Sequence, residues 1–203
     1  MTVAVFGGAF DPPHLGHVAL VESALEHFGF ERVLVVPAGS PPHKAVSTPV
    51  EIRAHLAELA FAGIARVEIS PIELEPGGPR YTIETLRRLS ESCDDLALLV
   101  GADQFAGFLG WREPEAILEL ASLAVASRPG YDGKELQPVL AALDRPERVV
   151  FFSIPPHPVS SREIRARVRN GLSIDDLVPS AVVAKIARHG LYKRRLRHPP
   201  GLH

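Results

Sequence analysis

The chain begins with a short apolar run, a glycine turn and a helical pattern, and this order constrains the fold more than any other feature. Residues 2–6 predict a strand, residues 7–17 read GGAFDPPHLGH, and residues 18–28 have the apolar spacing of a helix. Glycines let a backbone approach a phosphate closely, and the unpaired N–H groups at a helix N-terminus attract anions. The segment therefore predicts a phosphate-binding element at the edge of a sheet.

The same alternation of apolar runs and helical patterns continues along the chain. Several runs are continuously apolar, which is typical of parallel strands buried on both faces. The alternation predicts an α/β fold with a mostly parallel, Rossmann-like sheet, helices on both faces, and ligands bound beyond the carboxyl ends of the strands. The predicted strands are 2–6, 32–36, 66–69, 96–100, 123–127 and 149–154, and the predicted helices are 18–28, 50–62, 82–90, 114–121 and 133–143.

The last fifty residues predict a C-terminal helical region. Ser160 and Glu163 have the spacing of a helix-capping pair, and residues 178–189 predict a further helix. No linker or repeat interrupts the chain, so we expect a single domain over residues 1–192. The basic, proline-containing segment 193–203 is expected to be a frayed tail.

Composition excludes several classes of protein. The chain has 203 residues, of which 46% are hydrophobic and 23% charged, as in a globular domain. A formal net charge of -2 argues against binding to nucleic acid, and no apolar run approaches the about 18–20 residues needed to cross a membrane. The single cysteine, Cys93, excludes an internal disulfide. With no N-terminal signal, these features predict a cytoplasmic protein.

His14 and His17 are the candidate catalytic pair. They lie three positions apart at a helix start, so both imidazoles can face one ligand, and Gly16 leaves room between them. A zinc pair fits less well, because zinc takes three or four protein ligands and no partner cluster is evident. Neither GxGxxG nor GxxxxGK follows the first strand. A pair of helix-capping histidines is the alternative that the local sequence leaves open.

Two further segments could contact phosphates. Ser160, Ser161 and Arg165 place two hydroxyls and a guanidinium at a helix start, although an ordinary capped surface helix has the same pattern. Lys44 lies in a loop after the second predicted strand, where a lysine can reach a phosphate or simply face solvent.

Candidates for base and ring recognition follow the fourth predicted strand. Gly101 and Asp103 suit contacts to adenine and ribose, unless Asp103 only caps a helix that begins near Gln104. Trp111 is the single tryptophan and lies in a loop-like stretch, where a partly exposed ring could stack on a pyridine ring. A buried core position is the alternative for Trp111.

The segment GGAFDPPHLGH resembles the HxGH signature of the nucleotidylyltransferase superfamily. Within it, the chain resembles bacterial nicotinate-nucleotide adenylyltransferases from Val3 to Tyr192, because PPHK (41–44), RPG (128–130) and HGLY (189–192) occur in that family's order. The resemblance implies a Rossmann-like nucleotidylyltransferase fold and transfer of AMP from ATP to nicotinate mononucleotide, giving deamido-NAD and pyrophosphate in NAD biosynthesis. Mg²⁺ would be bound through the ATP phosphates and not by protein side chains.

The resemblance also implies a role for each site residue. His14, His17, Lys44 and Arg165 would be catalytic. The residues implied to bind ATP are Gly7, Gly8, Ala9, Phe10, His14, His17, Lys44, Gly101, Asp103, Ser160, Ser161 and Arg165. Those implied to bind nicotinate mononucleotide are Tyr81, Thr82, Trp111 and Arg128, with Trp111 on the ring and Arg128 on the phosphate.

No nucleophile–base pair is evident, so we expect direct in-line attack without a covalent enzyme intermediate. The alternatives are pantetheine-phosphate adenylyltransferase or another enzyme of the superfamily, an enzyme that accepts nicotinamide mononucleotide, and a non-catalytic nucleotide sensor. The HxGH motif and Arg165 argue against the sensor. Arg162 stands where the family usually has threonine, and its role is open, as are the choice between acid and amide and the formation of a homo-oligomer.

Overall fold

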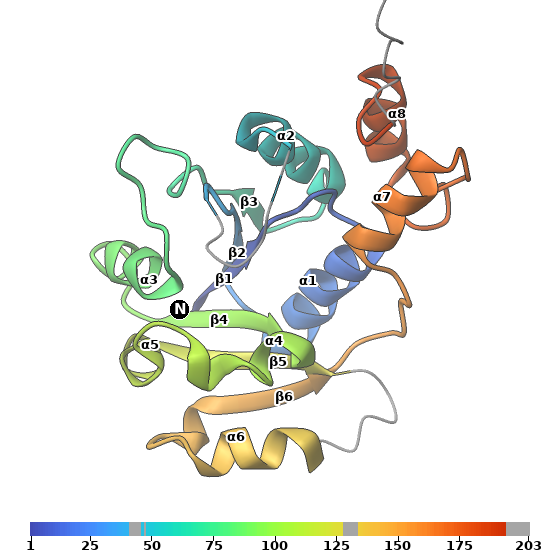
Figure 1. The fold of residues 1–203 in the computed structure, drawn as a ribbon. Coiled ribbons are helices and arrows are strands. Elements are labelled where there is room, and N and C mark those ends of the chain that lie inside the picture. The colour runs from blue at the N-terminus through green and yellow to red at the C-terminus, as the bar shows by residue number, and fades with distance from the viewer. Residues whose placement is uncertain (41–45, 47, 128–133, 194–203) are drawn as a thin grey trace, which may run out of the picture.

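The computed structural model describes the chain except for residues 41–45, 47, 128–133 and 194–203. A six-stranded sheet runs through its centre in the order β3-β2-β1-β4-β5-β6, and every neighbouring pair of strands is parallel (Figure 1). This is the strand order of the Rossmann fold, so the predicted fold class is confirmed. The strands are β1 (Val3–Gly8), β2 (Arg32–Pro37), β3 (Val67–Ile69), β4 (Leu96–Gly101), β5 (Ala121–Ser127) and β6 (Val149–Ser153).

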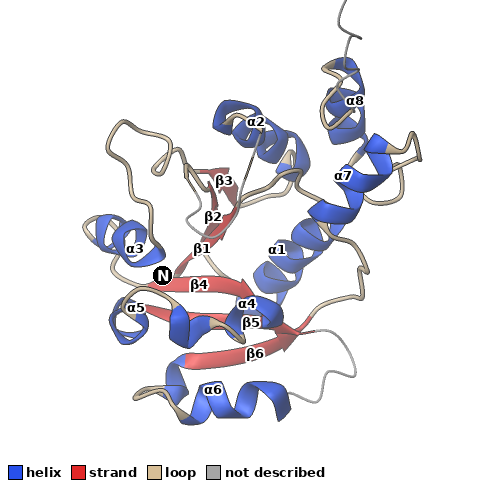
Figure 2. Ribbon diagram, viewed as in Figure 1, coloured by secondary structure: helices blue, strands red, loops and turns tan. Residues whose placement is uncertain are grey.

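Helices connect the strands and cover both faces of the sheet (Figure 2). Helices α1, α2, α7 and α8 pack into one apolar core, and α3, α5 and α6 pack into the other. The α-helices are α1 (Leu15–Phe28), α2 (Val50–Phe61), α3 (Thr82–Ser90), α4 (Ala102–Phe105), α5 (Pro114–Leu120), α6 (Gln137–Ala141), α7 (Ser161–Arg169) and α8 (Ser180–Arg188). The described 3-10 helices are η1 (Phe108–Gly110), η2 (Lys134–Leu136) and η3 (Pro146–Arg148).

The first strand explains why the predicted strands are continuously apolar. Val3 and Val5 pack into the core on the α3 side, whereas Ala4 and Phe6 pack into the core on the α1 side. Successive side chains of a strand point to opposite faces, so a central strand of a three-layer fold needs apolar residues at every position.

The predicted elements agree with the observed ones except at some boundaries. Helix α1 begins at Leu15 and not at residue 18, because His14 is its N-cap. The helix predicted over 133–143 is a 3-10 turn followed by the short α6, and Gly133 lies outside the described residues. Helix α4 was indicated only as a helix beginning near Gln104 in the alternative for Asp103, because four residues are too few to show a helical period.

The C-terminal helices pack on the α1 side of the sheet (Figure 1). The Ser160 hydroxyl caps α7 by accepting a hydrogen bond from the Glu163 N–H at 3.2 Å, as predicted, and Gly171 follows the helix with a φ of 69°. Apart from Lys193, the predicted tail 193–203 lies outside the described residues. No helix within the described ranges is long and apolar enough to cross a membrane.

Candidate active site

Two cavities meet at the carboxyl end of β1, which lies between β2 and β4 where the strand order reverses. Ligands of open parallel sheets bind at this position. Gly7, Gly8, Ala9 and Gln104 line both cavities. One cavity, the histidine cleft, encloses about 460 Å³, and its lining includes His14, Gly16, His17, Gly101, Asp103, His157, Ser160 and Ser161. The other, the tryptophan pocket, encloses about 180 Å³, and its lining includes Glu73, Arg80, Thr82, Thr85, Leu86 and Trp111.

The two predicted catalytic histidines lie together at the start of α1. The rings of His14 and His17 stack with their centroids 3.6 Å apart and their planes 25° apart. The Nδ1 atom of His17 accepts a hydrogen bond from the His14 backbone N–H at 3.1 Å. In neutral His17 the proton is therefore on Nε2, which makes Nε2–H the donor of this ring. The two histidines therefore cap the start of α1, which was the alternative for this pair, and their approach to one ligand stays a prediction.

Burial keeps His14 uncharged. Burial, together with the neighbouring His157, lowers the pKa of His14 to about 4. Its Nδ1 atom is buried without a hydrogen-bond partner among the described residues. This nitrogen lies over the first turn of α1, because a Cβ at Gly16 would be 3.2 Å from it.

Two glycines lie close to the rings of neighbouring side chains. A Cβ at Gly8 would lie 2.8 Å from the ring of Phe10, and one at Gly16 would lie 3.2 Å from Nδ1 of His14. Phe10 itself is buried, has a φ of 47°, and packs edge-on against His17 at 5.2 Å between centroids. Its ring thus fixes the position of His17. A Cβ at Gly7 would meet nothing, which leaves the strand end open to a ligand.

The C-terminal helices are tied to the turn between β1 and α1. The Ser161 hydroxyl donates to the Pro12 carbonyl at 2.8 Å, and Arg165 donates to the Asp11 carbonyl at 2.5 Å. Tyr192 donates its hydroxyl to the Asp11 carboxylate at 2.7 Å. Burial and this carboxylate raise the pKa of Tyr192. These contacts place the start of α7 across the histidine cleft from the start of α1.

A buried arginine that was not predicted as a site residue joins the loops after β1 and β2. Arg53 of α2 is 2% exposed and donates hydrogen bonds to the carbonyls of Ala9, Ala38, Gly39 and Thr48 at 2.7–3.3 Å. Burial lowers the pKa of its guanidinium. Its signal in the sequence was an arginine on the apolar face of a predicted helix.

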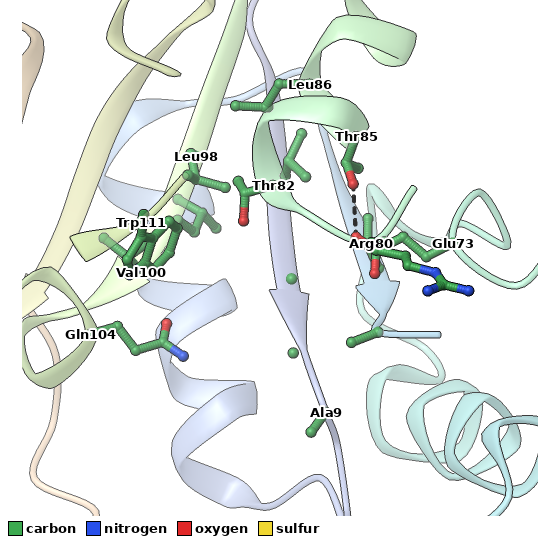
Figure 3. A pocket seen from close by; sticks show the side chains of 16 residues that line it. Ala9, Glu73, Arg80, Thr82, Thr85, Leu86, Leu98, Val100, Gln104 and Trp111 are labelled. Atoms are coloured by element: carbon green, nitrogen blue, oxygen red, sulfur yellow. Dashed lines mark hydrogen bonds between the residues drawn. The ribbon is translucent and has the colours of Figure 1, made fainter. Parts of the chain in front are cut away.

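The tryptophan pocket has an aromatic side and a polar side. Figure 3 places Trp111 and Gln104 on one side and Glu73 and Arg80 on the other. Glu73 accepts a hydrogen bond from the Thr85 hydroxyl at 2.8 Å, and burial raises the pKa of Glu73. The ring of Trp111 is partly buried and lies 5.4 Å from that of Phe108, so the predicted partly exposed ring is confirmed.

Ion pairs on the surface hold the rim of the tryptophan pocket. Arg112, next to Trp111, pairs with Glu84 of α3 at 3.1 Å and stacks over the Tyr81 ring at 4.6 Å. Arg87 pairs with Glu113 at 2.6 Å. Glu84 also accepts hydrogen bonds from the backbone N–H groups of Arg80 and Tyr81, so the start of α3 and the Trp111 loop share one carboxylate.

Most of the residues predicted to bind ATP lie together. The predicted residues in the histidine cleft are Gly7, Gly8, Ala9, Phe10, His14, His17, Gly101, Asp103, Ser160 and Ser161. Asp103 does not cap a helix near Gln104, because α4 begins at Ala102 with Gly101 as its N-cap. Arg165 does not line the cleft, since its guanidinium bonds to Asp11.

Only some of the residues predicted to bind the mononucleotide lie in the tryptophan pocket. Thr82 and Trp111 line the tryptophan pocket, whereas Tyr81 packs against Arg112 outside its lining. Lys44 and Arg128 lie outside the described residues. Arg162 is exposed and lines neither cavity.

Among the residues that the structure describes, no three His, Cys, Asp or Glu side chains form a group that could hold a metal ion. Asp103 is the one carboxylate in the described lining of the histidine cleft. Mg²⁺ prefers oxygen ligands and usually keeps several waters, so these residues fit an ion carried by a nucleotide better than an ion in a protein cage.

The fold and the site define a class of protein. Residues 5–167 match the family model described as cytidylyltransferase-like, which places the chain among the nucleotidyltransferases. A solved structure of Plasmodium falciparum nicotinic acid mononucleotide adenylyltransferase, complexed with NaAD, has the same fold with a TM-score of 0.77. It is 17% identical, and the match covers 94% of this chain and 97% of that one.

Closer relatives narrow the class to one family. The nicotinate-nucleotide adenylyltransferase named from Thermus thermophilus is 40% identical over 195 residues, which cover 95% of this chain and all of the relative. The one named from Rubrobacter xylanophilus is 37% identical over 206 residues, covering 99% and 96% of the two chains. The chain belongs to the nicotinate-nucleotide adenylyltransferase family.

Proposed function

We propose that this protein transfers AMP from ATP to nicotinate mononucleotide and releases pyrophosphate, giving deamido-NAD. One observation carries the proposal: two cavities of different chemistry share Gly7, Gly8 and Ala9 at the end of β1. An enzyme that joins two nucleotides needs two such sites, with the reacting phosphates meeting where the sites adjoin.

The histidine cleft is the proposed ATP site. The starts of α1 and α7 adjoin it, and helix N-termini favour phosphates. His14 and His17 are proposed to donate hydrogen bonds to the phosphate oxygens, while Gly101 and Asp103 contact the nucleoside. Ser160 and Ser161 are proposed to hold the β- and γ-phosphates. Lys44 and Arg165 remain proposed phosphate contacts from the family resemblance.

The tryptophan pocket is the proposed mononucleotide site. Its Trp111 face suits a pyridine ring. Thr82 is the first residue of α3, and the positive end of a helix dipole favours a carboxylate over a neutral amide. This argument supports the acid as the preferred substrate. Tyr81 and Arg128 remain proposed contacts from the resemblance.

The proposed reaction is a direct displacement. An oxygen of the mononucleotide phosphate forms a bond to the α-phosphorus of ATP, and the bond from that phosphorus to the bridging oxygen breaks. The electron pair leaves with pyrophosphate. His14 and His17 stabilise the charge that develops on the phosphate oxygens, which is the main work of catalysis in such transfers. Mg²⁺, carried by the ATP phosphates, would neutralise part of their charge when bound.

A substrate panel tests the proposal. Nicotinate mononucleotide, nicotinamide mononucleotide and phosphopantetheine are each offered with ATP and Mg²⁺, and pyrophosphate release gives kcat/KM. We expect the highest value for nicotinate mononucleotide, with no release when the second substrate is omitted. A higher value for the amide or for phosphopantetheine would assign one of the alternative activities. ATP binding by calorimetry without turnover on any substrate would indicate a sensor.

A further inference from the structure

A third imidazole lines the histidine cleft, on the loop between β6 and α7. His157 is half-buried and lines the same cavity as His14, His17, Ser160 and Ser161. Neither the HxGH motif nor the Ser160–Arg165 segment includes it. Its side chain forms no hydrogen bond or ion pair with the described residues, so it is not committed to holding the loop in place.

His157 lies over the start of α1 beside His14. A Cβ at Gly16 would lie 3.2 Å from the His14 ring and 3.5 Å from the Cβ of His157. The two imidazoles are close enough that His157 contributes to lowering the pKa of His14. The loop before α7 therefore places a nitrogen-bearing ring between the starts of α1 and α7.

The described lining of the histidine cleft offers few cationic groups to a triphosphate, so each imidazole donor is important there. The described lining of the histidine cleft contains three imidazoles, one carboxylate and no lysine or arginine. A triphosphate is a polyanion, and burial keeps His14 neutral. Because His157 is half-buried and lines the cleft, its ring can offer an N–H donor to a phosphate oxygen at the cleft wall.

We infer that His157 binds the β- or γ-phosphate of ATP and stays with the departing pyrophosphate. The inference rests on the proposed function, because it assigns the triphosphate to the histidine cleft. The position of His157, three residues before the α7 N-cap Ser160, places it at the end of the cleft proposed for these two phosphates. His157 is thus a polyphosphate-binding residue in addition to the HxGH pair.

The test compares His157→Ala and His157→Gln with the parent protein. For His157→Ala we expect the KM for ATP and the inhibition constant of pyrophosphate each to rise about tenfold, the size of one lost hydrogen bond to a charged group. The KM for nicotinate mononucleotide should stay within about twofold. His157→Gln keeps an N–H donor and should lose less. His55→Ala is the matched control, because the His55 side chain is 44% exposed on α2 and lines neither cavity.

Two outcomes would overturn the inference. An unchanged KM for ATP with unchanged pyrophosphate inhibition would show that His157 does not contact the triphosphate. A fall in kcat with no change in either constant would show that it only positions His14. Either result leaves the proposed function intact, because the parent protein still converts ATP and nicotinate mononucleotide to deamido-NAD and pyrophosphate. If the parent shows no turnover, the proposed function fails, and the affinities of the parent and His157→Ala for ATP, measured by calorimetry, still decide the role of His157.

Discussion

The histidine cleft and the tryptophan pocket share a strand end but are held in different ways. The cleft is fixed by hydrogen bonds to backbone carbonyls between segments far apart in the sequence, such as Ser161 to Pro12 and Arg165 to Asp11. The rim of the pocket is held by exposed ion pairs, such as Arg112 with Glu84. Exposed pairs contribute up to about 1 kcal/mol each, so the ring site is held less firmly.

The difference follows from what each cavity is proposed to do. Stabilising charge on a reacting phosphate requires donors at fixed positions, and buried contacts supply that fixity. Holding a ring requires mainly a flat apolar face, which tolerates small shifts. The comparison therefore predicts that changes to the HxGH histidines at the start of α1 act on turnover, whereas changes in the tryptophan pocket act on substrate affinity.

The largest expected effect is on His17. Replacing His17 with alanine should lower kcat by about 10²–10³, because it removes a preorganised donor to the transition state. Pyrophosphate release with saturating ATP and nicotinate mononucleotide measures it. His27→Ala, at the other end of α1, is the control and should keep parental kcat. A His17→Ala rate within a few-fold of the parent would remove His17 from the mechanism.

The second expected effect is on the pH dependence of stability and concerns His14, which is partly buried in the histidine cleft. Burial lowers the pKa of His14 in the folded protein to about 4, below its ordinary value of 6.5. As the pH falls from 6.5 to about 4, His14 of the unfolded chain binds a proton that His14 of the folded protein does not. The free energy of unfolding therefore decreases over this range. The His14 contribution lost between pH 7.5 and pH 5 should be about 2 kcal/mol.

Urea unfolding at the two pH values measures this loss. His14→Asn should reduce the pH dependence of the free energy of unfolding by about 2 kcal/mol relative to the parent. Leu109→Ala is the control, because it changes an exposed side chain and removes no titratable group. Equal pH dependence in the parent and His14→Asn would mean that His14 is charged in the folded protein.

The smallest expected effect is on the tryptophan pocket. Trp111→Ala should raise the KM for nicotinate mononucleotide about tenfold, the size of one lost stacking contact, and leave the KM for ATP within about twofold. Leu109→Ala is the control, since Leu109 is exposed on the neighbouring η1 and does not line the pocket. Equal rises in both KM values would contradict the assignment of the ring to this pocket.

Much of the fold could be predicted because its signals are local. Each predicted strand matches an observed one. The four strands inside the sheet, β2, β1, β4 and β5, need continuous apolar runs because both of their faces are covered. The N-cap of α7 was predicted because Ser160 and Glu163 are three residues apart. The start of α1 was missed by three residues, because histidine is an uncommon N-cap.

Residues of the candidate site could be predicted only where they belong to a recognisable sequence motif. His14, His17 and Trp111 were found from short patterns and from family resemblance. Arg53, Glu73 and Asp11 were missed, because each acts through partners that are distant in the sequence. His157 was missed because no local pattern distinguishes it from a loop residue.

The sequence alone determined the order of strands and helices, the glycine turn after β1, and the presence of two histidines at a helix start. Those properties depend on hydrophobic periodicity and on neighbours within a few residues. Only the tertiary structure decided that the start of α7 faces that of α1, that Arg53 joins two loops, and that two cavities adjoin at Gly7. Such contacts depend on how distant segments pack, and side-chain burial and hydrogen bonding across the fold fix them.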